Sequence, residues 1–244
     1  FGLVLGYFQA ILNQLEVHFY PGSYSKRAHA HWLEVVDEQT LTLGAPTHFM
    51  DLIHFVKDQK IKPPKAYSAI LGGARVSQEL WQNVKELLNI EFPSVGYGAT
   101  EASPGVTHLP PGIEPAANGD IGWPLKNVKT EITEEGIKFS GPNLCLAIYE
   151  NQKIFKPTSL LLRDSISLLD AAEGARFIFN GRTDSLINRG GFKISLEAIE
   201  SSISSHFQAK ALAVSFYDKR LGEDIGVLLE SDGGAAGGDF FVGL

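Results

Sequence analysis

Residues 66–88 read AYSAILGGARVSQELWQNVKELL, and this stretch decides the fold. It opens with an apolar run that ends at Gly72-Gly73, which is the pattern of a strand followed by a tight turn. After the turn, Leu80, Val84, Leu87 and Leu88 recur at the spacing of one helix face, behind a Ser77 suited to cap the helix. A strand, a turn and an amphipathic helix in this order predict an α/β fold.

The sequence on either side of this stretch predicts further structural units. Upstream, the apolar residues between Phe49 and Val56 repeat the helical spacing. Downstream, residues 108–118 contain three prolines and predict a loop. Short alternating runs between Asp120 and Arg182 then predict a small antiparallel β subdomain. Beyond it we expect a short strand at 186–187, a helix from about Leu196 with Ile199, Ile203 and Phe207 on one face, and strands at 211–217 and 225–229.

Composition sets outer limits on the class of protein. A chain of 244 residues favours two structural units over one, and 44% apolar with 20% charged residues excludes a disordered chain. The net charge of -7 argues against a nucleic-acid partner, which a broad cationic field would attract. The single cysteine, Cys145, excludes an intrachain disulfide and favours a reducing, cytoplasmic location. No apolar run is long enough to predict a membrane span.

Several standard motifs are missing or incomplete in the sequence. Neither a G-x-x-x-x-G-K-[ST] loop, a G-x-S-x-G elbow nor an H-E-x-x-H helix occurs. Residues 96–101, GYGATE, begin like a dinucleotide fingerprint, but Glu101 stands where the third glycine should be, so we reject a Rossmann site. His29 and His31 could share one strand face, yet they lack a third ligand and are better interpreted as surface residues. Cys145 is interpreted as a core residue because no basic residue adjoins it.

Three segments allow either a functional or a purely structural interpretation. Gly72-Gly73-Ala74 would let a flat ligand approach the backbone, or is a plain turn. In residues 96–103, GYGATEAS, Tyr97 could stack on a base while Thr100 and Glu101 serve a phosphate and a divalent metal. The same residues would also suit a polar loop with a packed tyrosine. Residues 181–201 crowd charged residues, a glycine pair and a helix start together, which is also the pattern of a solvated hairpin.

The order of these segments resembles that of a known superfamily. GGA, GYGATE, GDIGWPL, LRDSISL and GRTDSLINRGGFKISLEAIE follow one another as in the adenylate-forming superfamily of acyl-CoA synthetases, luciferases and peptide-synthetase adenylation domains. The last motif is the most specific, and its INRGGFKIS core is similar to that of the AMP-forming acid–CoA ligases. The resemblance runs from about residue 1 to about residue 230. It implies part of the superfamily's large α/β domain, with an α/β subdomain at 1–107 and a β-barrel-like subdomain at 108–181, followed by a partial α+β C-terminal domain at 182–244.

The resemblance also implies a role for individual residues. A nucleotide site would take its adenine pocket from the glycine turn, with Tyr97 on the base and Thr100 at the α-phosphate. Glu101 would bind Mg²⁺. Asp164, in LRDSIS where relatives usually show TGD, would accept hydrogen bonds from the ribose hydroxyls beside Arg182. Asp184 would be a hinge between domains. The implied nucleotide-binding residues are Gly72, Gly73, Ala74, Tyr97, Gly98, Asp164 and Arg182, and the implied CoA-tunnel loop carries Arg189, Gly190, Gly191 and Lys193.

The implied reaction is ATP-dependent activation of a carboxylic acid as acyl-AMP, followed by thioester formation with CoA. ATP, Mg²⁺ and CoA would be the cofactors and a small carboxylic acid the substrate. Two alternatives stay open: an adenylation domain that loads a carrier protein, and a non-catalytic adenylate-binding protein. A homo-oligomer is also left open. Because the superfamily's phosphate-binding loop and its late catalytic lysine have no counterpart here, we expect an internal fragment that is inactive alone.

Overall fold

The computed structural model describes residues 2–19, 26–150, 152–171, 174–183, 186–189, 192–207, 209–218, 222–230 and 242–243. Its contacts divide the chain into two compact units. The first unit comprises Phe1–Glu131, Lys138–Leu162 and Ser167–Phe179, and the second comprises Ile132–Ile137, Arg163–Ile166 and Asn180–Leu244. The domain boundaries expected after residues 107 and 181 stay a prediction.

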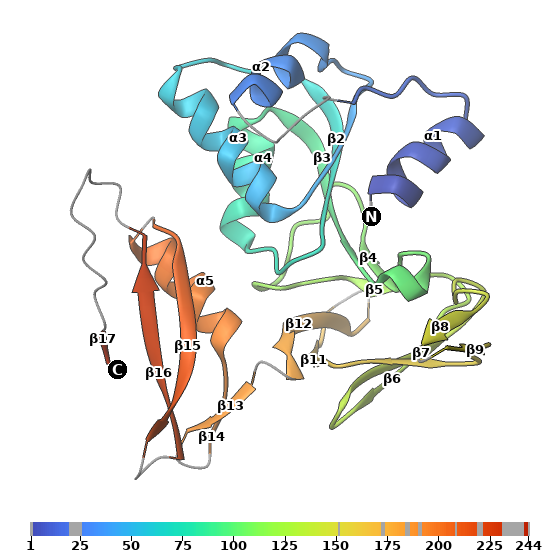
Figure 1. The fold of residues 1–244 in the computed structure, drawn as a ribbon. Helices are drawn as coiled ribbons and strands as arrows, with labels where there is room; N and C mark the ends of the chain where they lie inside the picture. The colour runs from blue at the N-terminus through green and yellow to red at the C-terminus, as the bar shows by residue number, and fades with distance from the viewer. Residues whose placement is uncertain are drawn as a thin grey trace. The chain divides into compact units, whose positions relative to one another are not determined.

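A five-stranded sheet with the order β1-β2-β3-β4-β5 is the centre of the first unit (Figure 1). Its first three strands are parallel and its last two are antiparallel to their neighbours. Strand β2 is buried along nearly its whole length, as expected for a parallel strand covered on both faces. The strands are β1 (Leu41–Gly44), β2 (Ala66–Gly72), β3 (Ile90–Tyr97), β4 (Thr107–Leu109) and β5 (Trp123–Pro124).

Helices pack against this sheet. Helix α4 (Gln78–Leu87) contacts β3, and α3 (Pro46–Asp58) contacts both α4 and β1. The Ser77 cap predicted from the sequence is confirmed, because the Leu80 N–H donates to the Ser77 hydroxyl at 3.0 Å. The predicted helix around Phe49–Val56 is confirmed as part of α3. The other helical segments are η1 (Gly2–Phe8), α1 (Gln9–Leu12), α2 (Lys26–Val35) and the short 3₁₀ turn η2 (Thr100–Ala102).

The hydrophobic core of the first unit lies between the sheet and these helices. Large, fully buried side chains of this core come from α3, from α4 and the residue after it, and from β2 and β3. Their burial supplies the main favourable free energy for folding this unit. These side chains are Phe49, Leu71, Trp81, Leu88 and Ile90.

Short strands follow the large sheet in the chain. They form a three-stranded sheet of order β10-β7-β6, a pair β11-β12 and a hairpin β8-β9. The predicted change from α/β to β structure after residue 120 is therefore confirmed. The strands are β6 (Lys129–Thr133), β7 (Gly136–Ser140), β8 (Ile148–Glu150), β9 (Lys153–Phe155), β10 (Leu160–Leu162), β11 (Asp164–Leu169) and β12 (Arg176–Arg182).

A buried ion pair ties the proline-rich loop to β12. Arg176 Nη1 lies 3.0 Å from Asp120 Oδ2 and also donates to the Glu114 carbonyl at 3.0 Å. The same carboxylate accepts the Ala116 N–H at 2.8 Å and the Gly122 N–H at 2.9 Å. Asp120 belongs to the GDIGWPL motif, so one function of this motif is to hold the loop against β12.

The second unit is an α/β sandwich of one sheet and one helix. Its sheet has the order β14-β13-β16-β15, with β17 on β16, and α5 packs on β15. Buried Ile187, Ala213, Ile225 and Val227 form its core. Helix α5 (Leu196–Phe207) and strands β13 (Leu186–Arg189), β14 (Phe192–Ser195), β15 (Ala211–Asp218), β16 (Gly222–Leu229) and β17 (Val242–Gly243) make up this part of the fold.

Most of the predicted elements in this unit are confirmed. Ile199 and Ile203 pack on the core as the helical spacing predicts. Phe207 departs from the prediction, since it is 59% exposed at the last residue of α5, where the helix ends.

Thr183 links the three separate stretches of the second unit. Its backbone N–H donates to the Arg163 carbonyl at 2.7 Å, and its hydroxyl donates to the Glu135 carbonyl at 3.1 Å. Arg163, Glu135 and Thr183 come from three different stretches of the chain. One threonine therefore joins them by two hydrogen bonds.

Two sequence interpretations are corrected by the fold. His29 and His31 lie in helix α2 and not on a strand, because the alternation of two histidines is too short a signal to fix a period of two. The surface interpretation is also wrong for His29, which is buried. The loop predicted from His108 begins later, because Thr107–Leu109 form strand β4 beside β3. Among the described helices, none combines the length and the apolar character that crossing a membrane requires.

Candidate active site

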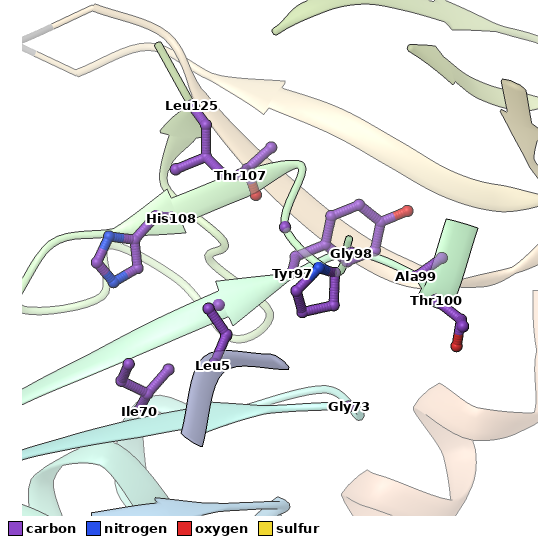
Figure 2. A pocket seen from close by; sticks show the side chains of 13 residues that line it. Leu5, Ile70, Gly73, Tyr97, Gly98, Ala99, Thr100, Thr107, His108 and Leu125 are labelled. Carbon is purple, nitrogen blue, oxygen red and sulfur yellow. The ribbon is translucent and has the colours of Figure 1, made fainter. Parts of the chain in front are cut away.

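A cavity of about 330 Å³ opens at the carboxyl ends of the parallel strands β2 and β3 (Figure 2). In open α/β sheets this edge is where ligands bind, because the chain leaves each strand there through loops that can be shaped around a ligand. The cavity lies within the first unit. Its wall nearest the strand ends consists of Gly73, Gly96, Tyr97, Gly98, Ala99 and Thr100.

Glycines keep this part of the wall open. Gly73 has φ +84°, and a Cβ placed on it would meet no atom within 4 Å, so the backbone beside it borders free space. At Gly98 a Cβ would overlap the carbonyl oxygen of Pro104. A side chain is therefore sterically excluded at Gly98, and at Gly73 it is disfavoured by the left-handed backbone.

Tyr97 supplies the aromatic surface of the cavity. It ends β3, and its ring centre lies 5.9 Å from that of Phe179 on β12. Strand pairing fixes its backbone opposite Thr107. The Tyr97 side chain is half-buried and also lines the cavity. A planar group in the cavity could therefore stack against its ring.

The tight turn η2 follows directly and exposes two polar side chains. Thr100 lines the cavity, and Glu101 beside it is exposed. The Glu101 carbonyl accepts the Cys145 N–H at 2.8 Å, which anchors this turn from the other side. Cys145 itself is a free thiol of intermediate exposure, so the prediction of a core residue is fulfilled only in part.

The donor set at this turn fits a magnesium ion that arrives with a nucleotide. Mg²⁺ is usually held by one or two carboxylates together with phosphate oxygens and water, and not by a cage of protein ligands. The exposed Glu101 carboxylate offers one such ligand. Within the described ranges, no group of three histidine, cysteine, aspartate or glutamate side chains is arranged to hold a metal ion.

The remaining residues of the predicted nucleotide site are distributed over both units. Gly72 is buried in β2, where it pairs with Gly96, and Ala74 is exposed just beyond the turn. In the second unit, Arg182 Nη1 lies 3.9 Å from the Oδ1 atom of the largely buried Asp164. The structure thus brings Gly73, Tyr97, Gly98 and Thr100 to one cavity, and it brings Asp164 and Arg182 to each other.

The predicted tunnel loop falls partly outside the described residues. Asp184, Gly190 and Gly191 lie outside them. Lys193 is placed in β14, where its Cα pairs with that of Asn188. Arg189, at the end of β13, donates from Nε to Asp224 Oδ1 at 2.6 Å. The roles of the hinge and tunnel residues stay predictions.

The other end of the cavity was not found from the sequence. Leu5, Ile70 and Leu125 make it apolar, and Thr107 and His108 from β4 complete it. Burial lowers the pKa of His108 below its ordinary value. These residues come from four separate segments, so no local pattern could have brought them together; only the alternation around His108 hinted at a strand.

The chain is similar to known proteins in sequence and in fold. The family model described as "AMP-binding enzyme" matches residues 1–140. The chain is 27% identical to the acyl-CoA ligase cnsG of Penicillium expansum over 94% of its length, and 27% identical to the acyl-CoA ligase sidI of Aspergillus fumigatus, also over 94%. It covers 52% and 42% of these two relatives, so it spans about half of their length. The o-succinylbenzoate CoA synthetase of Bacillus subtilis, solved with its acyl-adenylate intermediate, shares the fold with a TM-score of 0.73 at 20% identity, over 93% of this chain and 48% of that one.

Proposed function

Because the chain belongs to the AMP-binding enzyme family, we propose that the protein activates a carboxylic acid as its acyl-adenylate and transfers the acyl group to the thiol of CoA. The observation that carries this proposal is the cavity at the ends of β2 and β3, where Gly73, Tyr97 and Thr100 meet. The acyl-CoA ligases to which the chain is similar support both steps.

The two steps balance without any further reactant. A carboxylate oxygen of the acid attacks the α-phosphorus of ATP, and the bond to the bridging oxygen of pyrophosphate breaks. The product is a mixed anhydride, whose carbonyl carbon is far more electrophilic than that of a carboxylate. The CoA sulfur then attacks this carbon, AMP leaves with the electron pair of the broken bond, and the thiol proton passes to solvent.

The wall around Gly73 and Tyr97 is proposed to hold the adenosine part. The exposed Gly73 lets a flat base approach the backbone, and the Tyr97 ring offers it a stacking surface. Because Gly98 has no side chain, the backbone that leads from Tyr97 towards Thr100 passes close to the Pro104 carbonyl. Gly72 and Ala74 flank Gly73 and would set the position of its turn.

The turn at Thr100 and Glu101 is proposed to serve the phosphates. In-line displacement at the α-phosphorus spreads negative charge over the phosphoryl oxygens, and donors fixed in advance stabilise it. The Thr100 hydroxyl can donate such a bond. Glu101 would hold Mg²⁺, which supplies positive charge to the phosphates when it is bound.

The ion pair of Asp164 and Arg182 is proposed to bind the ribose. A carboxylate accepts hydrogen bonds from two neighbouring hydroxyls, and Arg182 Nη1, 3.9 Å from Asp164 Oδ1, lies beside it. For the second step we propose Asp184 as the hinge, with Arg189, Gly190, Gly191 and Lys193 beside the incoming CoA. A cytoplasmic location, where ATP and CoA are abundant, completes the proposal.

Acid-dependent exchange of labelled pyrophosphate into ATP tests the first step. The protein expressed from its complete gene is assayed with a panel of carboxylic acids and Mg²⁺, and CoA thioester is measured separately. We expect exchange with at least one acid, and a loss of about 10²-fold in Glu101→Gln, because one charge-stabilising group is removed. Glu131→Gln on β6 is the control, since Glu131 is also exposed but, unlike Glu101, is not next to a residue that lines the cavity.

The outcomes separate the parts of the proposal. Exchange without thioester, together with acylation of a phosphopantetheine carrier protein, would replace CoA as the acceptor and keep the first step. Binding of adenylate without exchange for any acid would show a non-catalytic adenylate-binding protein. A Glu101→Gln variant as active as the Glu131→Gln control would remove Glu101 from the site.

A further inference from the structure

The apolar end of the cavity has a single titratable side chain, His108. Aliphatic side chains of Leu5, Ile70 and Leu125 surround this end, and Figure 2 shows His108 on the side of the cavity away from Thr100. Nucleotide phosphates need polar and charged partners, which this end lacks. Resting on the function proposed above, the apolar end is the part of the cavity that suits the body of the acid.

The backbone of His108 is held on both sides, whereas its ring nitrogen Nε2 is left without a partner among the described residues. Its backbone pairs with Gly96 on one side and Trp123 on the other. The Nε2 atom is buried and has no hydrogen-bond partner in the part of the chain that the structure describes. A buried polar atom without a partner is costly, and such atoms are rare in folded proteins unless a ligand or water completes them.

Two described neighbours of His108, Gly96 and Thr107, leave room for a ligand beside its ring and do not offer the ring a hydrogen bond. Gly96, opposite His108 in the register, has no side chain to fill the space between them. The hydroxyl of Thr107 donates to the Ile121 carbonyl at 2.7 Å, so its proton is already used. A half-turn about Cβ–Cγ keeps the shape of an imidazole and exchanges nitrogen with carbon positions, so the ring can present a nitrogen to a ligand from either edge.

We propose that His108 determines substrate specificity by hydrogen bonding to an uncharged polar substituent, a hydroxyl or carbonyl group, on an otherwise apolar acyl chain. Burial lowers the pKa of His108, so the ring is neutral at pH 7 and offers one donor and one acceptor. A neutral ring in apolar surroundings pairs with an uncharged group without the desolvation cost that a second carboxylate would bring.

Acyl-sulfamoyl adenosines, which mimic the acyl-adenylate without reacting, test the proposal by calorimetry. The series carries straight acyl chains of increasing length, each made without a substituent, with a terminal hydroxyl, with a terminal ketone and with a terminal carboxylate. At one chain length we expect the hydroxyl or ketone analogue to bind about tenfold more tightly than the unsubstituted one. In His108→Leu this ratio should fall to within about twofold, whereas His54→Leu, a substitution of an exposed histidine on α3, should keep it.

The outcomes distinguish this inference from the function on which it rests. If no analogue binds, the proposed function and this inference fall together. If the analogues bind but no substituent matters at any length, or if the preference survives in His108→Leu, His108 has no such role and the proposed function stands. A preference for the terminal carboxylate overturns the uncharged class. Where His108→Leu fails to fold, His108→Phe, which keeps a planar ring and removes both nitrogens, takes its place with the same expected loss of preference.

Discussion

At the scale of single residues, the ring of Tyr97 carries the clearest prediction. Stacking of a base on an aromatic side chain is worth about 1–3 kcal/mol, so Tyr97→Ala should weaken binding of an acyl-sulfamoyl adenosine by about 5- to 150-fold. Tyr97→Phe keeps the ring and should bind nearly as the wild type does. Calorimetric titration measures both, with Tyr149→Ala on the exposed hairpin as the control. Equal affinity in Tyr97→Ala and Tyr149→Ala would contradict stacking.

His108 should make the stability of the protein depend on pH. The pKa of His108 is lowered by burial from its ordinary value of 6.5, whereas the unfolded chain keeps that value. Well above pH 6.5, His108 is neutral in both the folded and the unfolded state, so it does not change the free energy of unfolding. As the pH falls below about 6.5, His108 takes up a proton in the unfolded state first, and the stability of the fold declines until the pH reaches the folded-state pKa. His29, whose pKa burial also lowers, adds a similar contribution.

His108→Leu should therefore flatten the pH dependence. Between about pH 8 and about pH 5 the Tm of the wild type should fall further than the Tm of the variant. The contribution of His29 is the same in both proteins, so it does not affect this difference. At pH 8 the variant should be as stable as the wild type or more so, since it removes a buried nitrogen without a partner. Thermal unfolding followed by circular dichroism is the measurement, and identical pH slopes would disprove the effect.

Single residues also show how far sequence reasoning reaches. Gly73, Tyr97, Gly98 and Thr100 lie in two local motifs that the family resemblance assigns to one nucleotide site, and the structure places them around one cavity. His108 was missed because its significance depends on a glycine in the neighbouring strand. The spacing of residues within one segment does not reveal how two strands pair with each other.

At the scale of elements, the buried pair of Asp120 and Arg176 should matter most for stability. The two side chains are 0% and 9% exposed, so removing one charge leaves the other buried without compensation. Asp120→Asn should destabilise the protein by about 3–5 kcal/mol. The matched control is Glu91→Gln, whose pair with Lys65 is 2.7 Å long but 40% and 46% exposed, and which should change stability little.

Urea unfolding of the two variants gives the comparison directly. A large loss in Asp120→Asn with little loss in Glu91→Gln supports burial as the deciding factor. Equal losses would show that the loop of residues 110–122 does not depend on this pair.

Elements were predicted well where their period was strong. Helices α3, α4 and α5 and strand β2 follow directly from apolar spacing, and tertiary packing agrees with it. Strand β4 has only three residues beside a proline-rich loop, so its pairing with β3, and not its own sequence, makes it a strand. His29 and His31 were misplaced for a different reason, since two alternating residues are too short a signal to fix a period.

At the scale of the whole molecule, the chain spans about half the length of the relatives it matches. We therefore predict that the purified 244-residue chain, alone, supports no acid-dependent pyrophosphate exchange, because the remaining groups around the α-phosphate cannot replace those that relatives carry elsewhere. The same chain should still bind an acyl-sulfamoyl adenosine weakly through the wall at Tyr97. Exchange at a rate typical of intact ligases would refute the prediction.

The three hydrogen-bonded stretches of the second unit have a consequence for synthesis. Residues 132–137 and 163–166 leave the ribosome before Thr183, to which Glu135 and Arg163 are bonded, has been made. During translation those two stretches stay without their final neighbours until Thr183 has been made, and the last stretch of the first unit, Ser167–Phe179, is made only just before it. The order of translation therefore differs from the order of assembly, and the nascent chain completes its second unit only after the last stretch emerges.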